Sequence, residues 1–229
     1  MWNRNWDANT PGGEQDIYVE VNHGPLLVDN NIFLSPYSVH TRGSQGDAYV
    51  HNIFAGAFRI IHHDRRQTPF HKAHSTDVVA LHDNPCGDNR FYNNLFVGHG
   101  DLRGFDAARF PVSMDGNVFV KGAKPSKHEQ NPLMMADGDP ALKLIEKDDG
   151  FYFEINIDKG WSIGRTRPLV TTELLGKTKI SDAAFENPDG KPLCVNVDYF
   201  GKPRDEANPT PGPFENPGEG LLKLKVWGP

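Results

Sequence analysis

The 229-residue sequence contains only two cysteines, Cys86 and Cys194, too few for a disulfide framework. It has no apolar run near the roughly 18 residues of a membrane-spanning helix, and residues 1–7 lack the pattern of a secretory signal. Basic residues are outnumbered, since 24 lysines and arginines stand against 30 acidic residues and give a net charge of −6. These absences argue against a disulfide scaffold, a membrane partner and a nucleic-acid partner.

A short phrase of asparagine, an aliphatic residue and phenylalanine occurs four times. Its phenylalanines are Phe33, Phe54, Phe96 and Phe119, separated by 21, 42 and 23 residues. A fixed period of about this size is typical of stacked coils, none of which can bury a hydrophobic face alone. The sequence therefore predicts a solenoid in which the four phenylalanines stack in the core.

The residues within one period favour strands over helices. Segments 24–33, 47–54 and 90–96 are short runs of β-forming residues broken by turn residues. The repeated asparagine suits a turn, because its side chain bonds nearby main chain and tolerates left-handed backbone, and stacked copies could form a ladder. A leucine-rich solenoid is the alternative, but its leucine consensus and helical segments are missing. We therefore predict an all-β, right-handed parallel β-helix, a solenoid like that of pectate lyases.

The sequence pattern changes near residue 136, beyond which the repeated phrase of asparagine, aliphatic residue and phenylalanine no longer occurs. We expect residues 1–135 to hold the coils and residues 136–229 to form a β-rich segment that covers the end or flank of the helix. The strands expected there alternate apolar and polar residues; they are 150–158, 167–176, 192–198 and 221–227. Residues 203–218, rich in proline and glycine, should run over the surface as extended chain.

The doubled interval between Phe54 and Phe96 contains a polar insertion. Residues 60–74 hold four histidines and three basic residues, and we expect a long loop that lines a binding cleft; a plain solvated loop is the alternative. The histidines, His62, His63, His71 and His74, match no compact zinc motif, so we predict no metal and no cofactor. Hydrogen bonding of a substrate by His71, His74 and Asp77 is the preferred interpretation.

The expected strand at residues 16–22 carries the candidate catalytic residue. Ile17, Val19 and Val21 should face the core, so that Glu20 points outward in a row with Asp16, Tyr18 and Asn22. Asn22 and the following His23 give Glu20 polar neighbours suited to binding a sugar. The alternative is an ordinary solvated carboxylate.

The spacing of coils tests whether Glu20 has a catalytic partner. Matching positions on adjacent coils are about 5 Å apart, close to the roughly 5 to 5.5 Å between the carboxyl groups of retaining glycosidases. One coil downstream lies near Thr41–Gly43, without a carboxylate, and one coil upstream lies before Met1. Asp16 is too far along the strand, while Asp29 and Asp47 could approach only if the register shifts. We therefore expect the chain to be the C-terminal part of a longer protein that carries the second carboxylate upstream.

Several segments resemble glycoside hydrolase family 120, whose best-known members are retaining β-xylosidases. The segments that carry the resemblance are 16–25, 28–35, 44–52, 71–77 and 88–94. The resemblance implies a β-helix with a second β-domain inserted nearer the N-terminus, absent here. It implies that Glu20, in the Val-Glu-Val-Asn-His-Gly-Pro motif, is the general acid/base and that the nucleophilic aspartate lies about one coil upstream. Asp47 stands where a small residue is expected, which leaves a shifted specificity open.

Three functions follow from these observations. The first is a fragment of a retaining β-xylosidase-like hydrolase of short xylo-oligosaccharides, inactive alone, with Glu20 as catalytic residue. Asn22, His23, His71, His74 and Asp77 would bind its substrate. The second is a polysaccharide lyase, which needs a calcium-binding carboxylate cluster and a base such as Arg65, Arg66 or Lys72. The third is a β-helix that binds an oligosaccharide or polysaccharide without turnover.

Further features leave more than one interpretation open. Four aromatic residues could stack on sugar rings, or they could instead anchor loops. They are Trp2, Trp6, Tyr18 and Tyr37. The oligomeric state stays open, and so does the compartment, which for a bacterial protein of this kind could be the cytoplasm, the periplasm or the exterior.

Overall fold

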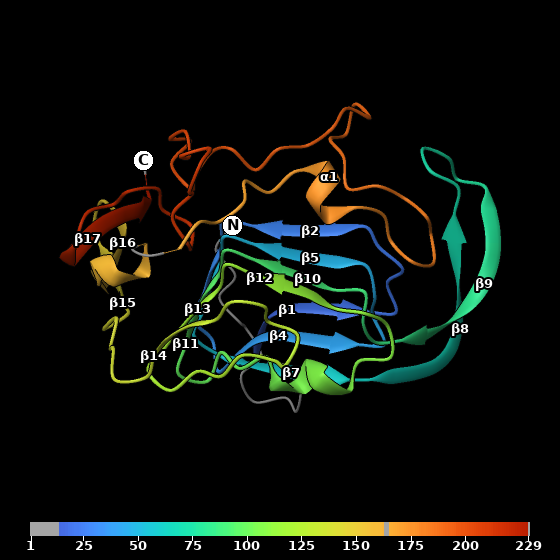
Figure 1. The fold of residues 1–229 in the computed structure, drawn as a ribbon, viewed down its shortest axis with the longest axis horizontal. Helices are drawn as coiled ribbons and strands as arrows, with labels where there is room; N and C mark the ends of the chain where they lie inside the picture. Colours follow the sequence, from blue (N-terminus) through green and yellow to red (C-terminus); the bar gives the residue numbers. More distant parts are fainter. Residues whose placement is uncertain (1–13, 163–164, 229) are drawn as a thin grey trace.

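The computed structural model describes residues 14–162 and 165–228. Parallel strands stack in three sheets that wind as coils, which confirms the predicted parallel β-helix (Figure 1). The first sheet has the order β1 (Gln15–Glu20), β4 (Tyr37–Arg42) and β7 (Ala57–Ile61). The second has the order β12 (Ser113–Asp115), β10 (Arg90–Tyr92), β5 (Asp47–Val50) and β2 (Leu26–Asp29). The third has the order β14 (Leu133–Met135), β13 (Val118–Val120), β11 (Leu95–Val97), β6 (Ile53–Phe54) and β3 (Ile32–Phe33).

The repeated phenylalanines form one column inside the solenoid, as predicted. Phe33 stacks on Phe54 at 5.0 Å between ring centroids, Phe54 on Phe96 at 5.2 Å, and Phe96 on Phe119 at 5.0 Å. All four are buried, and they align across β3, β6, β11 and β13. Because β11 pairs directly with β6, the doubled interval is one coil with an insertion.

The repeated asparagines form the expected ladder beside this column. The Oδ1 atoms of Asn52, Asn94 and Asn117 each accept the backbone N–H of the asparagine one coil before, at 2.9 Å. The side-chain amides of Asn31, Asn52 and Asn94 donate along the same series, at 3.0 to 3.1 Å. Glu129 ends the ladder by accepting from Asn117 Nδ2 at 2.7 Å. The ladder satisfies polar groups that the solenoid buries.

The residue before each ladder asparagine, not the asparagine itself, takes the left-handed backbone conformation. These residues are Asn30, His51, Asn93 and Gly116, with φ of 55°, 54°, 56° and 71°. Each lies at the corner where a strand of the second sheet passes into the third. A single left-handed residue turns the chain sharply, so the corner repeats in every coil although only the asparagine after it is constant.

The insertion is a hairpin, so the prediction of a loop over residues 60–74 is wrong. Strands β8 (His63–His71) and β9 (Val78–Pro85) pair antiparallel and project sideways from the solenoid, beyond the ends of the first-sheet strands (Figure 1). Backbone pairing between the two strands satisfies polar groups that a free loop would leave to water. The histidines and arginines of the insertion therefore stand on a defined two-stranded ribbon.

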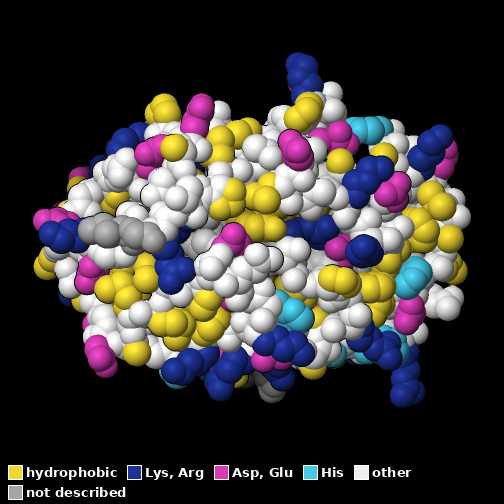
Figure 2. All heavy atoms as spheres, viewed as in Figure 1, with side chains coloured by type: hydrophobic (Ala, Val, Ile, Leu, Met, Phe, Trp, Pro, Cys, Tyr) yellow, Lys and Arg dark blue, Asp and Glu magenta, His cyan; other side chains and the backbone are white. Residues whose placement is uncertain are grey.

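The C-terminal part adds a separate antiparallel sheet beside the third solenoid sheet (Figure 1). Its strands are β15 (Lys143–Lys147), β16 (Gly150–Ile157) and β17 (Gly220–Trp227), and the short helices of the chain are η1 (Arg103–Ala107), η2 (Lys159–Trp161) and α1 (Thr172–Leu175). No helix among the described residues is long and apolar enough to cross a bilayer. Acidic and basic side chains are interspersed on the face shown in Figure 2.

Two of the strands expected in this part are absent. Residues 167–176 contain α1, because the side chain of Thr171 caps Leu174 and Gly176 ends the helix with φ of 67°. Residues 192–198 make only isolated bridges. Their alternation reflects burial instead, since Leu193 and Val195 pack with Val170 against the second solenoid sheet.

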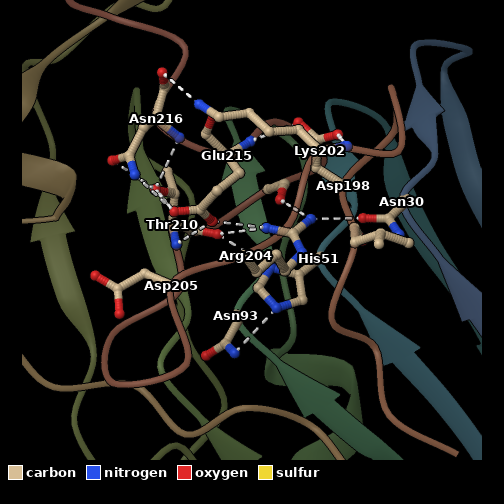
Figure 3. A network of polar contacts seen from close by, with 12 residues as sticks. Asn30, His51, Asn93, Asp198, Lys202, Arg204, Asp205, Thr210, Glu215 and Asn216 are labelled. Atoms are coloured by element: carbon tan, nitrogen blue, oxygen red, sulfur yellow. Dashed lines mark hydrogen bonds and ion pairs between the residues drawn. The ribbon is translucent and has the colours of Figure 1, made fainter.

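Residues 203–218 run over the surface only in part, because Arg204 and residues 209–215 are buried while residues 205–207 are exposed. Arg204 and Glu215 form an ion pair with side chains 0% and 1% exposed (Figure 3). Arg204 also donates to Asn30 Oδ1 at 2.6 Å, and Thr210 O lies 3.0 Å from His51 Nδ1. The segment is thus held against the left-handed corners of successive coils. We call Arg204, Glu215 and Thr210 the clasp.

Candidate functional site

Strand β1 ends at Glu20, two residues earlier than predicted. Val21 has φ of 48°, an unusual value for a β-branched residue, and it turns the chain so that Asn22 and His23 leave the strand. Tyr18 is exposed, as expected for an outward position, and Val19 is buried. The Glu20 side chain is 32% exposed. The carboxylate therefore lies on the outer face of the first sheet, at the edge where the chain turns.

Two arginines lie between Glu20 and a second carboxylate, Asp64. Arg42 is the register partner of Glu20 on the next coil, which confirms that this position has no carboxylate. Its Nε lies 3.8 Å from Glu20 Oε1 and 2.7 Å from Asp64 Oδ2. Arg66, from β8, donates to Glu20 and holds Asp64 Oδ1 at 2.8 Å through its Nε. The hairpin thus lies on the same side of the solenoid as Glu20.

The arginines keep both carboxylates ionised. Hydrogen bonding from Arg66 is the main cause that lowers the pKa of Glu20, with smaller contributions from Tyr18 and Arg42. Hydrogen bonds from Arg66 and Arg42 hold the pKa of Asp64 far below its usual range. Both oxygens of Asp64 accept hydrogen bonds from Arg42 and Arg66, which leaves no free lone pair for Asp64 to act as a nucleophile or a base. Glu20 in this arrangement is held as the carboxylate, which is the form of a general base, whereas a general acid needs a raised pKa.

A cleft of about 440 Å³ opens next to Val21, the residue after Glu20, between the turn after β1, the tip of the hairpin and a C-terminal loop; Glu20 itself is not part of its lining. Its lining is formed by residues 21–25, 69–74, 181, 183, 184 and 186–188. Asn22, His23, His71 and His74 are among them, so four of the five predicted substrate-binding residues come together. His74 Nε2 lies 2.8 Å from Glu186 Oε1, which closes the cleft between hairpin and C-terminal loop. Asp77 stands apart in the hairpin turn, exposed, with its N–H bonded to Ser75 Oγ.

Asn22 and His23 form the floor of the cleft and are held by internal bonds. Asn22 donates from Nδ2 to Asp47 Oδ1 at 2.8 Å, and its Oδ1 accepts from Gly24 N at 3.1 Å. His23 is only 5% exposed. Its Nε2 lies 3.1 Å from Thr68 O, and its Nδ1 contacts Gln45. Burial lowers the pKa of His23, so this ring is neutral and joins the solenoid to the hairpin.

The other aspartates of the sequence analysis are engaged in structural bonds. Asp16 accepts from Ser35 Oγ at 2.6 Å and Ser35 N at 3.0 Å, so it does not project freely. Asp29 accepts from Asn30. Asp47 is completely buried, and burial raises its pKa to about 7. None of the three stands beside Glu20 in the register of the coils.

Of the remaining aromatic candidates, the structure describes Tyr18 and Tyr37. The ring of Tyr18 packs on His40, and Arg59 lies over Tyr37, while Trp2 and Trp6 lie outside the described residues. Within residues 14–162 and 165–228, no group of three or more histidine, cysteine or acidic side chains could hold a metal ion. The calcium cluster that a lyase would need therefore finds no support in this part of the chain.

A second cavity, of about 420 Å³, lies away from Glu20 between the end of β16 and residues 210–219. Ile53 and Leu95 of the solenoid, with Trp161 and Phe214, form much of its lining. These residues belong to the hydrophobic cluster that joins the solenoid to the C-terminal sheet. The cavity is part of that packing interface.

Sequence reasoning missed several residues of the site. The sequence placed Arg42 one coil after Glu20, but its ion pair with Glu20 was not expected. Arg66 had been weighed only as a lyase base, and no periodic signal indicates that it, Asp64 or Glu186 meets residues of the first coil.

The fold and the site together define a parallel β-helix protein similar to a glycoside hydrolase. The structure of XylC in complex with xylose superimposes on the chain with a TM-score of 0.86 and 29% sequence identity, over 93% of this chain and 38% of XylC. This match to a structure solved with xylose confirms the resemblance to glycoside hydrolase family 120. The chain spans 38% of the length of that structure. No family model and no curated protein matches the sequence.

Proposed function

We propose that the chain is the part of a retaining β-xylosidase-like glycoside hydrolase that supplies the general acid/base, Glu20. The observation that carries this proposal is the match over 93% of the chain to a β-helix solved with xylose. The position of Glu20 supports it, because the carboxylate is partly exposed on the outer sheet face and the residue after it, Val21, begins a cleft that histidines line.

Glu20 would act twice in the reaction. In the first step it protonates the leaving oxygen while a second carboxylate attacks the anomeric carbon, and in the second step it deprotonates the attacking water. A residue one coil before Glu20 would stand about 5 Å away, the separation that a retaining enzyme needs. β1 is the edge of its sheet among the described residues. We place the nucleophile on a coil stacked against that edge in the whole protein.

The cleft would hold the leaving-group sugar of a short xylo-oligosaccharide. His71 and His74 line the wall that belongs to the hairpin, and His71 is exposed. Asn22 and His23 shape the floor, and Asp77 would reach only a sugar that extends past the hairpin turn. Hydroxyl groups of a sugar can bond to side-chain donors and acceptors of this kind.

Hydrolysis of aryl xylosides by the whole protein tests the role of Glu20. We expect Glu20→Ala to lower turnover about 10²- to 10⁴-fold for substrates with poor leaving groups. The loss should be smaller for good leaving groups, which need little protonation. Added azide should restore turnover of an activated substrate and give a xylosyl azide of retained configuration, because azide needs no base to attack the intermediate.

Glu14→Ala is the matched control, since Glu14 is an exposed glutamate just before β1. It should leave hydrolysis unchanged. Full activity of Glu20→Ala on a substrate with a poor leaving group would refute the proposal.

A further inference from the structure

Arg66 differs from the other groups around Glu20 because the hairpin supplies it. The solenoid itself supplies Tyr18, His40 and Arg42. Arg66 donates to Glu20 through Nη2, and Asp64 Oδ2 accepts from the same nitrogen at 2.8 Å while Asp64 Oδ1 accepts from Nε at 2.8 Å. The Arg66 backbone N–H adds a bond of 2.9 Å to Asp64 Oδ1. Asp64 therefore fixes the guanidinium in the position from which Nη2 reaches Glu20.

Asp64 joins this arginine to the solenoid. Its side chain is 4% exposed, and it also binds Arg42 at 2.7 Å. A carboxylate held by two guanidinium groups through several charge-assisted bonds is rigid. The base of the hairpin thus places a fixed cation at Glu20, and the side chain of Arg66 is still 51% exposed to solvent.

We propose that Arg66 is a positioning residue for Glu20: it holds Glu20 as the carboxylate in the empty site and sets the pH at which Glu20 takes up the proton that the first step consumes. This inference rests on the proposed function. Glu20 must gain a proton from solvent, transfer it to the leaving oxygen as the glycosidic bond breaks, and regain one from water when the sugar is released. An ion pair with Arg66 favours the carboxylate that the second step requires and opposes the first protonation.

The titration of Glu20 in this chain tests the effect of Arg66 on the protonation of Glu20, and it does not require the chain to be enzymatically active. ¹³C NMR of labelled glutamate carboxyl groups, with Glu20→Gln to assign the signal, gives the midpoint. The Arg66 variants leave unchanged the other groups that face Glu20, namely Tyr18, His40 and Arg42. We expect the midpoint to move to higher pH in Arg66→Gln and to stay close to the wild-type value in Arg66→Lys, which keeps the charge.

Arg65→Gln is the matched control, because it removes the same charge from the neighbouring exposed residue of β8. Its midpoint should not move beyond the small effect of a screened distant charge. An unmoved midpoint in Arg66→Gln, or an equal shift in Arg65→Gln, would overturn the proposal. Thermal unfolding of each variant shows that it is folded.

The pH profile of the whole protein links the coupling to catalysis. The alkaline limb of kcat/KM reports the general acid of the free enzyme, so it should move upward in Arg66→Gln by the shift seen in the titration, and not in Arg65→Gln. Hydrolysis that persists in Glu20→Gln would overturn the proposed function. If Glu20→Gln is inactive but the alkaline limb of kcat/KM does not move in Arg66→Gln, only the role of Arg66 is overturned.

Discussion

At the scale of single residues, Asp47 shows how a polar group can be accommodated beneath a site without taking part in it. It is fully buried, and its carboxyl oxygens accept from Asn22 Nδ2 at 2.8 Å and Asn89 Nδ2 at 3.2 Å. Two amide donors do not offset its desolvation, so its pKa rises to about 7. The family resemblance placed a small residue at this position. The carboxyl supports the floor of the cleft through Asn22, at a cost in stability when it ionises.

Replacing Asp47 by asparagine should therefore stabilise the chain at high pH. Because the folded-state pKa is raised from 3.8 to about 7, the stabilising contribution of Asp47 is complete below about pH 4 and is lost as pH rises through about 7. Asp47→Asn should be more stable than wild type at pH 8, by up to about 4 kcal/mol, and the difference should shrink toward pH 5.

Urea unfolding at both pH values measures this difference. The buried Glu129, whose pKa is also raised to about 7, is common to both proteins and cancels in the comparison. A difference that is the same at pH 5 and pH 8 would contradict the prediction.

At the scale of elements, the coils are held by two parallel columns, one of stacked rings and one of amides. Phe54 lies between Phe33 and Phe96, and the edges of Tyr49 and Phe58 pack against it at 6.0 and 5.0 Å. Since each ring contacts the rings of the coils above and below, the column couples the coils to one another. Coupling of this kind lets a local change in one coil act on the stability of the whole stack.

Phe54→Ala should cost about 3 to 5 kcal/mol of unfolding free energy, because Phe54 is 0% exposed and no neighbour can fill the cavity. Denaturant unfolding should show a lower midpoint with little change of slope. Leu221→Ala is the control, since Leu221 is 69% exposed and should change stability by less than about 0.5 kcal/mol. A cost below about 1 kcal/mol for Phe54→Ala would mean that the column is not formed in solution.

At the scale of the whole molecule, the clasp decides how the C-terminal part lies on the solenoid. Arg204 binds the corner residue Asn30 and the carboxylate of Glu215, and Gly212 N donates to Asn93 O at 2.8 Å (Figure 3). Burial of both charges is costly, and it is offset by their ion pair together with the hydrogen bonds that Arg204 donates to Asn30 and that Glu215 accepts from Thr210. The clasp thus fixes a proline- and glycine-rich segment that has little regular backbone pairing of its own.

Arg204→Ala should destabilise the chain by about 3 to 5 kcal/mol, because it leaves the buried Glu215 without its cation. Residues 203–218 should also become cleavable by proteases before the solenoid unfolds. Lys177→Ala removes an exposed ion pair with Asp182 and should cost less than about 1 kcal/mol. Equal effects of Arg204→Ala and Lys177→Ala, measured by urea unfolding and limited proteolysis, would argue against the clasp.

The periodic part of the molecule could be predicted from the sequence. The phenylalanine column and the asparagine ladder follow from the period, because in a solenoid the neighbour of a residue is the residue one coil away. The same rule locates Arg42 beside Glu20. The identity of the corner residue could not be predicted, since Asn30, His51, Asn93 and Gly116 share a backbone conformation and not a side chain.

The site itself depends on contacts between residues far apart in the chain. Arg66 meets Glu20 across 46 residues, His74 meets Glu186 across 112, and Arg204 meets Asn30 across 174. No repeat relates these pairs, and charged residues in a sequence indicate solvent exposure as readily as burial. The sequence by itself determined the stacked coils and the strand that presents Glu20. Only the tertiary structure decided which cations reach Glu20 and which loops close the cleft, because desolvation and ion pairing depend on where the chain brings distant charges together.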